Sequence, residues 1–208
     1  MTETPVETSD PMSTARLEAF SDGVFAIAIT LLVLNVEVPQ VERGRLAQGL
    51  LDQWPSYAAY VVSFLTIGII WVNHHGTFSR IARVDRPLLF LNLLLLMAVS
   101  FIPFPTRLLS QFLDTGTDAR VAAFVYACTM TVMSLAFSGI WIWAVYRRLL
   151  RGDEEQRMRV RSTIPRFGIG MLVYGLSIVV AVISPRACLV LFAAIAIFYV
   201  FDQQSAAK

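Results

Sequence analysis

Residues Pro87–Thr106 read P-L-L-F-L-N-L-L-L-L-M-A-V-S-F-I-P-F-P-T, an apolar run without a charged side chain. An α-helix needs about 20 such residues to cross the hydrocarbon core of a bilayer. Similar runs recur along the chain, and only the first of them carries acids, Asp22 and Glu37, near its ends. They occupy Phe20–Val38, Trp54–Val72, Val121–Tyr146, Phe167–Pro185 and Ala187–Phe201. The sequence therefore predicts an all-α integral membrane protein with six transmembrane helices per chain.

The composition argues against most water-soluble classes of protein. Of the 208 residues, 56% are hydrophobic and 15% are charged, and the mean hydropathy is +0.63, whereas about 25% of the residues in a soluble domain are charged. The net charge of +2 is too small to indicate a nucleic-acid partner. Cys128 and Cys188 lie inside apolar runs, which argues against a disulfide framework or a zinc site. No catalytic constellation is visible, so we expect neither an enzyme nor a cofactor.

Three segments divide the chain. Residues 1–15 form a polar N-terminal segment, residues 16–201 form the six-helix transmembrane domain, and residues 202–208 form a short tail. Met1–Thr14 contains three acids and no Lys or Arg. It therefore lacks the basic region of a signal peptide, and we expect the first span to be retained.

The distribution of Lys and Arg among the short loops predicts the orientation in the membrane. The side that holds both termini carries 12 basic residues, and the opposite side carries 5. We therefore expect cytoplasmic termini in a multi-pass protein of the cell membrane. The linker Arg147–Arg166 supplies seven of the arginines, together with three acids at 153–155. Topological charge on a solvated loop and a lipid-headgroup patch both remain open as interpretations of this linker.

Polar side chains stand at the membrane boundary of the first span. Ser21 and Asp22 lie there, and an uncompensated carboxylate at that depth costs a few kcal/mol. Asp22 therefore needs a partner, and Arg16, His74 and His75 are the candidates on the same side of the membrane. Alternatively, Ser21 and Asp22 cap the start of the helix, and the two roles can coexist.

An apolar stripe follows on the same helix. Ile27, Leu31 and Leu34 share one face, and Thr30 flanks it. Such a stripe packs in a core, faces lipid or lines a pore, and its spacing alone does not distinguish these roles. In the third span, Pro103 is expected to act with Pro105 as a helix terminator.

The neighbouring histidines also allow two roles. His74 and His75 titrate near neutrality in their unperturbed state, which suits a pH sensor or a proton path. They could equally be interfacial hydrogen-bond donors that hold Asp22 or a carbonyl group. Asn92 is expected to join helices through hydrogen bonds.

Three stretches carry a resemblance to a known family. Arg16-x-x-x-Phe20-Ser21-Asp22-Gly23, followed by Val-Phe-Ala-Ile-Ala-Ile-Thr-Leu-Leu-Val-Leu, resembles the first helix of the transmembrane protein 175 family. This family comprises potassium channels of endolysosomes and their prokaryotic relatives. The resemblance extends to Trp71-x-x-His74-His75-x-x-Phe78, to Asn92-Leu93-Leu94-Leu95-Leu96 and to Phe101-x-Pro103-Phe104. The last three spans match only in general character.

The resemblance implies a potassium-preferring cation channel assembled as a homotetramer in the lipid membrane, with potassium as the permeant ion. It implies that the first helix lines the pore, and that a hydrophobic constriction replaces a carbonyl selectivity filter. The constriction would comprise Ile27, Leu31 and Leu34, with Thr30 as the nearby hydroxyl. The resemblance also implies a polar network that fixes the first helix. Its members would be Arg16, Phe20, Ser21, Asp22, Trp71, His74, His75 and Asn92.

A proton-coupled secondary cation transporter is the alternative, in which Asp22 and the His74/His75 pair would carry the proton. Transporters often hold a charge near the midplane of the membrane. Here the carboxylates inside spans lie near helix ends, and the middle of every span is uncharged. This distribution favours the channel.

Overall fold

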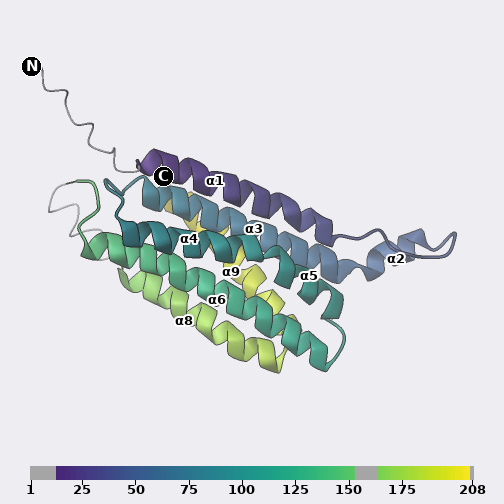
Figure 1. Cartoon of the computed structure of the whole chain (residues 1–208). Coiled ribbons are helices and arrows are strands. Elements are labelled where there is room, and N and C mark those ends of the chain that lie inside the picture. The colour runs from purple at the N-terminus through teal and green to yellow at the C-terminus, as the bar shows by residue number, and fades with distance from the viewer. Residues whose placement is uncertain (1–12, 153–163, 207–208) are drawn as a thin grey trace, which may run out of the picture.

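A computed structural model describes residues 13–152 and 164–206 of the chain as a bundle of helices (Figure 1). Apart from one isolated bridge between Ile81 and Leu150, the regular structure among these residues is helical. In chain order the helices are α1 (Thr14–Leu31), the 3-10 helix η1 (Leu32–Asn35), α2 (Leu46–Asp52), α3 (Trp54–Phe78), α4 (Arg86–Phe101), α5 (Pro103–Phe112), α6 (Thr117–Tyr146), α8 (Ile164–Ile183) and α9 (Pro185–Ala206).

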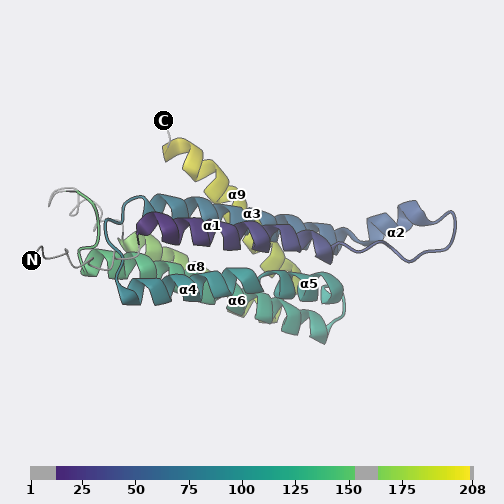
Figure 2. The same cartoon turned by 45° about the horizontal axis from the view of Figure 1, so that its top comes forward.

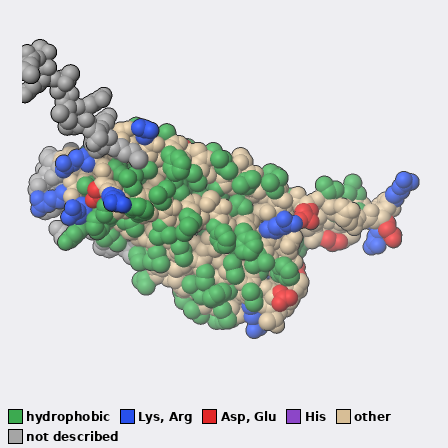
Figure 3. All heavy atoms as spheres, in the orientation of Figure 1, with side chains coloured by type: hydrophobic (Ala, Val, Ile, Leu, Met, Phe, Trp, Pro, Cys, Tyr) green, Lys and Arg blue, Asp and Glu red, His purple; other side chains and the backbone are tan. Residues whose placement is uncertain are grey.

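Four helical segments of the described chain are long and apolar enough to cross a membrane by length and composition. They are Thr14–Asn35, Trp54–Phe78, Arg86–Phe112 and Thr117–Tyr146. Gly170–Ile183 and Pro185–Tyr199 are shorter apolar helices. On the face shown in Figure 3, hydrophobic side chains cover the length of the bundle, and charged side chains gather toward its two ends. The protein is therefore an all-α membrane protein with four long apolar helices and two shorter ones.

The ends of the bundle differ in what they carry. The start of α1 and the end of α9 lie at the same end in both views (Figures 1 and 2). The loops that follow α3 and α6 lie at this end too. At the opposite end the chain between α1 and α3 projects beyond the bundle and carries α2, a short helix that the sequence analysis did not anticipate.

Some of the sequence predictions concern residues that the structure does not describe. The polar segment 1–15 is described only from residue 13, and no side chain of the tail 202–208 is described. Within the basic linker, Arg157, Arg159 and Arg161 lie outside the described residues, as does the side chain of Arg166.

The expectation that Pro103 and Pro105 terminate the third span is wrong. α4 does end at Phe101, but helix resumes at Pro103, so that Arg86–Phe112 forms one apolar segment of 27 residues. Proline is tolerated in the first turn of a helix because its missing N–H would have no intrahelical partner there. The two prolines therefore divide the span into α4 and α5 without ending it.

Buried hydroxyl groups fasten this break to two other helices. The Thr106 hydroxyl donates to the carbonyl oxygen of Ile102 at 2.8 Å. Ser63 Oγ lies 2.8 Å from Thr106 Oγ1 and 3.0 Å from the hydroxyl oxygen of Tyr126. Because the Thr106 hydroxyl proton is already donated to the Ile102 carbonyl, Thr106 Oγ1 can only accept from Ser63. The Ser63 hydroxyl proton is then engaged, so the Tyr126 hydroxyl donates to Ser63 Oγ. This chain of donors joins α6, α3 and the α4–α5 break.

Small residues allow α6 to pack closely against α4, α5, α8 and α9. Its buried side chains include several alanines, and side chains of this size let helix backbones approach closely in membranes. These alanines are Ala119, Ala122, Ala123, Ala127, Ala136 and Ala144. Larger buried side chains, among them Tyr126 and Trp141, fill the spaces between them.

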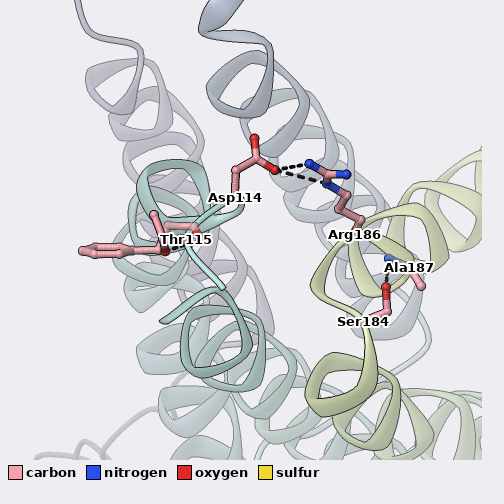
Figure 4. A network of polar contacts seen from close by, with 6 residues as sticks. Asp114, Thr115, Ser184, Arg186 and Ala187 are labelled. Atoms are coloured by element: carbon pink, nitrogen blue, oxygen red, sulfur yellow. Dashed lines mark hydrogen bonds and ion pairs between the residues drawn. The ribbon is translucent and has the colours of Figure 1, made fainter. Parts of the chain in front are cut away.

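Polar contacts hold the end of the bundle that is remote from the termini. Asn35 Nδ2 donates to the carbonyl oxygen of Pro103 at 3.0 Å, and Arg107 Nη2 lies 2.7 Å from Glu37 Oε1. At the α8–α9 turn, Arg186 donates through Nη2 and Nε to Asp114 Oδ1 at 2.6 and 3.1 Å (Figure 4). These contacts tie the end of η1 to α5, and the α8–α9 turn to the loop after α5.

The hydroxyl chain predicts the effect of Ser63→Ala. The substitution leaves the Tyr126 hydroxyl without its buried acceptor, and we expect it to destabilise the protein by about 1 kcal/mol. The thermal unfolding midpoint of the detergent-purified protein measures this loss. Ser79→Ala is the control, because among the described residues the exposed Ser79 hydroxyl bonds only to the carbonyl oxygen of Gly76 in the adjacent helical turn. Equal midpoints for the two variants would contradict the role given to Ser63.

Candidate functional site

The first helix has one face buried in the bundle and one face turned away from it. Its buried side chains recur at helical spacing, at Leu17, Ser21, Phe25, Ala28 and Leu32. The predicted apolar stripe occupies another face, with exposed fractions of 62% for Ile27, 42% for Leu31 and 68% for Leu34. The stripe is therefore not part of the core of a single chain.

Ser21 and Asp22 do not cap the start of this helix. α1 begins at Thr14, about two turns earlier than that role requires, and Ser13 Oγ accepts from the N–H of Arg16 at 3.4 Å. Ser21 instead lies within the helix, where its hydroxyl donates to the carbonyl oxygen of Leu17 at 2.8 Å. The capping interpretation is wrong because the helix extends beyond the apolar run.

A directed chain of hydrogen bonds joins α3, α4 and α1. Since the Ser21 hydroxyl donates to Leu17, its oxygen accepts from Asn92 Nδ2, which is 3.0 Å away. The other amide atom, Asn92 Oδ1, is an acceptor and lies 2.9 Å from His74 Nε2. His74 Nε2 must therefore carry the proton, and the imidazole is held in one tautomer. His74, Asn92 and Ser21 are all fully buried.

The two histidines have different surroundings. His74 stacks on Phe78 with ring centres 4.3 Å apart, and Phe25 lies 5.3 Å away on α1. Its Nδ1 atom is buried and has no hydrogen-bond partner among the described residues. His75 is exposed, because consecutive helical residues point about 100° apart. The pair therefore does not act as one unit.

The hydrogen-bond partner of Asp22 is none of the three basic side chains that the sequence analysis offered. Trp71 Nε1 donates to Asp22 Oδ1 at 2.9 Å, and both side chains are exposed. Arg16, His74 and His75 form no ion pair with Asp22 in the described part of the chain. The indole N–H thus satisfies the carboxylate without a neighbouring positive charge.

Beside the stripe lies an open hollow of about 320 Å³ between α1 and α4. Phe20, Ile27 and Leu31 line it from α1, and Leu93, Leu96 and Ser100 line it from α4. Thr30 is exposed, and its hydroxyl proton is shared between the carbonyl oxygens of Ala26 and Ile27, each 2.9 Å away. The lone pairs of Thr30 Oγ1 therefore remain available on the exposed surface of α1.

The structure thus brings together five of the eight residues expected in the polar network, in two groups. Ser21, Asn92 and His74 form the buried chain, with Phe25 packed against it, and Asp22 and Trp71 form a separate exposed pair. Phe20 lines the hollow. Arg16 and His75 are exposed and take no described part in either group.

Comparison with known proteins identifies the family to which this chain belongs. The family described as "Endosomal/lysosomal potassium channel TMEM175" matches residues 16–103, the segment that contains the network. A potassium channel of Streptomyces collinus is 48% identical over 189 residues, which cover 90% of this chain and 92% of the relative. The chain belongs to the TMEM175 family. It is a member of a family of ion channels and not an enzyme.

Two further relatives extend the comparison. The crystal structure of a lysosomal potassium-selective channel TMEM175 homologue from Chamaesiphon minutus superposes with a TM-score of 0.82 at 41% identity, covering 91% of this chain and 97% of that chain. The endosomal/lysosomal proton channel TMEM175 of Gallus gallus is 35% identical over 156 residues, or 71% of this chain and 30% of the relative. The chain therefore has the TMEM175 channel fold.

Sequence reasoning missed the contacts that fix the far end of the first helix. The amide of Asn35 and the carboxylate of Glu37 bind to the α5 segment at Pro103 and Arg107. A signal was present, because Glu37 and Arg107 are opposite charges near span ends on the same side of the membrane. The pairing itself depends on the continuation of the third span as α5.

The different surroundings of the two histidines predict different tolerance to the same substitution. His74→Leu leaves Asn92 Oδ1 buried without its donor, and we expect a loss of about 1–3 kcal/mol of stability. His75→Leu changes an exposed side chain, and we expect a change within about 0.5 kcal/mol. Thermal unfolding of both variants in detergent measures the difference. A larger loss for His75→Leu would contradict the described chain of hydrogen bonds.

Proposed function

We propose that this protein is a potassium-preferring cation channel in which the exposed face of α1, contributed by each copy of a homotetramer, lines the pore. One observation carries the proposal. The bundle leaves the apolar stripe of α1 uncovered, while another face of the same helix is buried and hydrogen-bonded to α4 through Ser21. α1 is also the least buried of the four long spans, with 28% of its apolar window buried against 50% for α6. The names of the Streptomyces and Chamaesiphon relatives support potassium as the permeant ion.

Hydrophobic side chains around a narrow pore can act as a gate. Rings of Ile27, Leu31 and Leu34 from several copies would exclude water, and conduction would require widening or partial hydration of the pore. Such a constriction does not replace the hydration shell of an ion as a ring of carbonyl oxygens does. We therefore expect a modest preference for potassium over sodium.

Thr30 supplies the polar group nearest to this constriction. Its proton is engaged by backbone carbonyls, so its oxygen can act only as an acceptor toward the pore. A ring of such oxygens would give a partly dehydrated cation somewhere to bind between the apolar rings. No cofactor is required.

The orientation follows from the charges. The bundle end that holds the start of α1 and the end of α9 also holds the loops after α3 and α6, which are rich in arginine (Figure 2). The positive-inside rule assigns this end to the cytoplasm of a cell membrane crossed by all six helices. The proposed partners are other copies of the chain and membrane lipid, without nucleic acid.

The transporter alternative has less support. Proton transfer by His74 would require Nδ1 to gain a proton in a site where it has no acceptor among the described residues. Asp22 is the ninth of the 18 residues of α1, and it accepts a hydrogen bond from Trp71 Nε1. His74 lies near the end of α3 and away from the middle of its span, where transporters bind their substrates.

Replacement of Ile27 tests the proposal. In liposomes that contain the purified protein, Ile27→Asn should raise cation leak and reduce the preference for potassium over sodium, because a polar ring wets the constriction. Cation flux under potassium and sodium gradients measures both quantities. Ile197→Asn is the matched control, since Ile197 is also exposed on an apolar helix, α9.

Potassium-preferring flux that persists unchanged in Ile27→Asn would retain the channel and contradict the assignment of its pore. Absence of flux in the wild-type protein at varied pH and voltage would contradict the channel itself. Flux that saturates with cation concentration would favour a carrier.

A further inference from the structure

Two loops at the end of the bundle that holds the start of α1 are joined by backbone contacts. The N–H of Ala82 donates to the carbonyl oxygen of Leu149 at 2.7 Å, and the N–H of Arg151 donates to that of Arg80 at 2.8 Å. Between these bonds, the buried side chains of Ile81 and Leu150 lie at the isolated bridge. The loops 79–86 and 147–152 therefore form one fixed surface.

This surface carries excess positive charge. The two loops contain six arginines and one acid, Asp85. Asp85 is already engaged, because it caps α4 through the N–H of Leu88 at 3.0 Å and accepts from Trp143 Nε1 at 3.0 and 3.1 Å. Arg147 is the arginine nearest to it, with Nε at 3.9 Å.

The other five arginines form what we call the arginine platform. All five are exposed, and none forms an ion pair with another described residue. Repulsion between these like charges is thus not relieved within the described chain. The members of the platform are Arg80, Arg83, Arg86, Arg148 and Arg151.

Arg148 occupies a backbone position with a left-handed conformation, which a residue with a side chain disfavours. α6 ends with the N–H of Leu149 bound to the carbonyl of Ala144 and the N–H of Arg148 bound to that of Val145. This is the helix-ending motif that usually places glycine at its left-handed residue. Arg148 holds that place with a φ of 54°, which side chains with a Cβ disfavour. Arginine at this position therefore costs conformational free energy relative to glycine. Interactions of its guanidinium group can compensate for that cost.

Exposed aromatic side chains beside the platform indicate that it lies at the depth of lipid headgroups. The guanidinium carbon of Arg86 is 5.8 Å from the ring centre of Phe90, whose side chain is 60% exposed on the apolar exterior of α4. Tyr146, two residues before Arg148, is 77% exposed. Tyrosine side chains are enriched at the membrane–water interface, where arginine side chains reach the phosphate layer.

We propose that the arginine platform is a binding site for anionic lipids, which it holds through their phosphate groups. The planar guanidinium donates two parallel hydrogen bonds to a phosphate, and several guanidiniums on one fixed surface can share an anionic headgroup. The position beside exposed aromatic side chains favours a lipid over a soluble phosphate, because the acyl chains can lie along the apolar exterior. This site is remote from the α1 stripe, and its test does not depend on conduction.

Native mass spectrometry of the full-length protein in detergent tests the site. The protein is mixed with phosphatidylglycerol or phosphatidylcholine, and the lipid molecules retained per chain are counted. We expect the wild type to retain phosphatidylglycerol preferentially. Each arginine removed from the platform should weaken that retention by about fivefold, and phosphatidylcholine should change little.

Two variants and one control separate the site from general charge. Arg148→Gly should keep or raise the thermal midpoint, because glycine suits the left-handed turn, while it weakens phosphatidylglycerol retention. The double variant Arg83→Gln/Arg151→Gln should weaken retention further. The control Arg43→Gln/Arg45→Gln removes two arginines from the loop at the opposite end of the bundle and should behave as the wild type.

Three results would overturn the proposal. The first is equal retention of the two lipids by the wild type. The second is equal loss of phosphatidylglycerol in the control and the platform variants, which would indicate attraction by net charge alone. The third is displacement of phosphatidylglycerol by equimolar glycerol 1-phosphate, which would identify a site for soluble phosphates.

Discussion

A chain of hydrogen bonds from His74 through Asn92 and Ser21 to the carbonyl of Leu17 sets the rotation of the first helix. In a bilayer no water replaces a lost buried hydrogen bond, so polar groups in the core must find partners within the protein. Once Ser21 faces α4, Phe25, Ala28 and Leu32 must follow it into the bundle, because they share its face. The stripe that contains Ile27 is then directed outward.

The far end of this helix is held as well. Asn35 binds the carbonyl oxygen of Pro103, the first residue of α5, next to the point where the third span divides into α4 and α5. The break is itself held by the hydroxyls of Ser63, Thr106 and Tyr126. The outward stripe thus lies between two positions, Ser21 and Asn35, that are fixed to the bundle by hydrogen bonds. We therefore expect gating to involve side-chain rotation or small tilts of α1 more than rotation of the whole helix.

Much of the fold could be predicted from the sequence, because uncharged runs of spanning length are a strong signal. The extension of the third span past Pro103 could not, since whether a proline ends a helix or begins the next depends on neighbours such as Ser63. The partner of Asp22 was sought among positive charges, whereas the Trp71 N–H also satisfies a carboxylate. His74 and His75 are indistinguishable in the sequence, and only the rotation of α3 decides which of them is buried. The constriction and the tetramer remain predictions that rest on the family resemblance and on the uncovered face of α1.

The most direct measurement of the central claim is cross-linking between copies at position 27. In a Cys128→Ala/Cys188→Ala background, the single substitution Ile27→Cys places one thiol on the exposed face of α1, and Ile197→Cys places one on α9 as a control. If α1 lines the pore, oxidation in liposomes should produce covalent dimers through position 27 and should lower potassium flux, and a reductant should restore that flux. If Ile27→Cys remains monomeric on oxidation with unchanged flux, while Ile197→Cys forms dimers, α1 does not surround the pore.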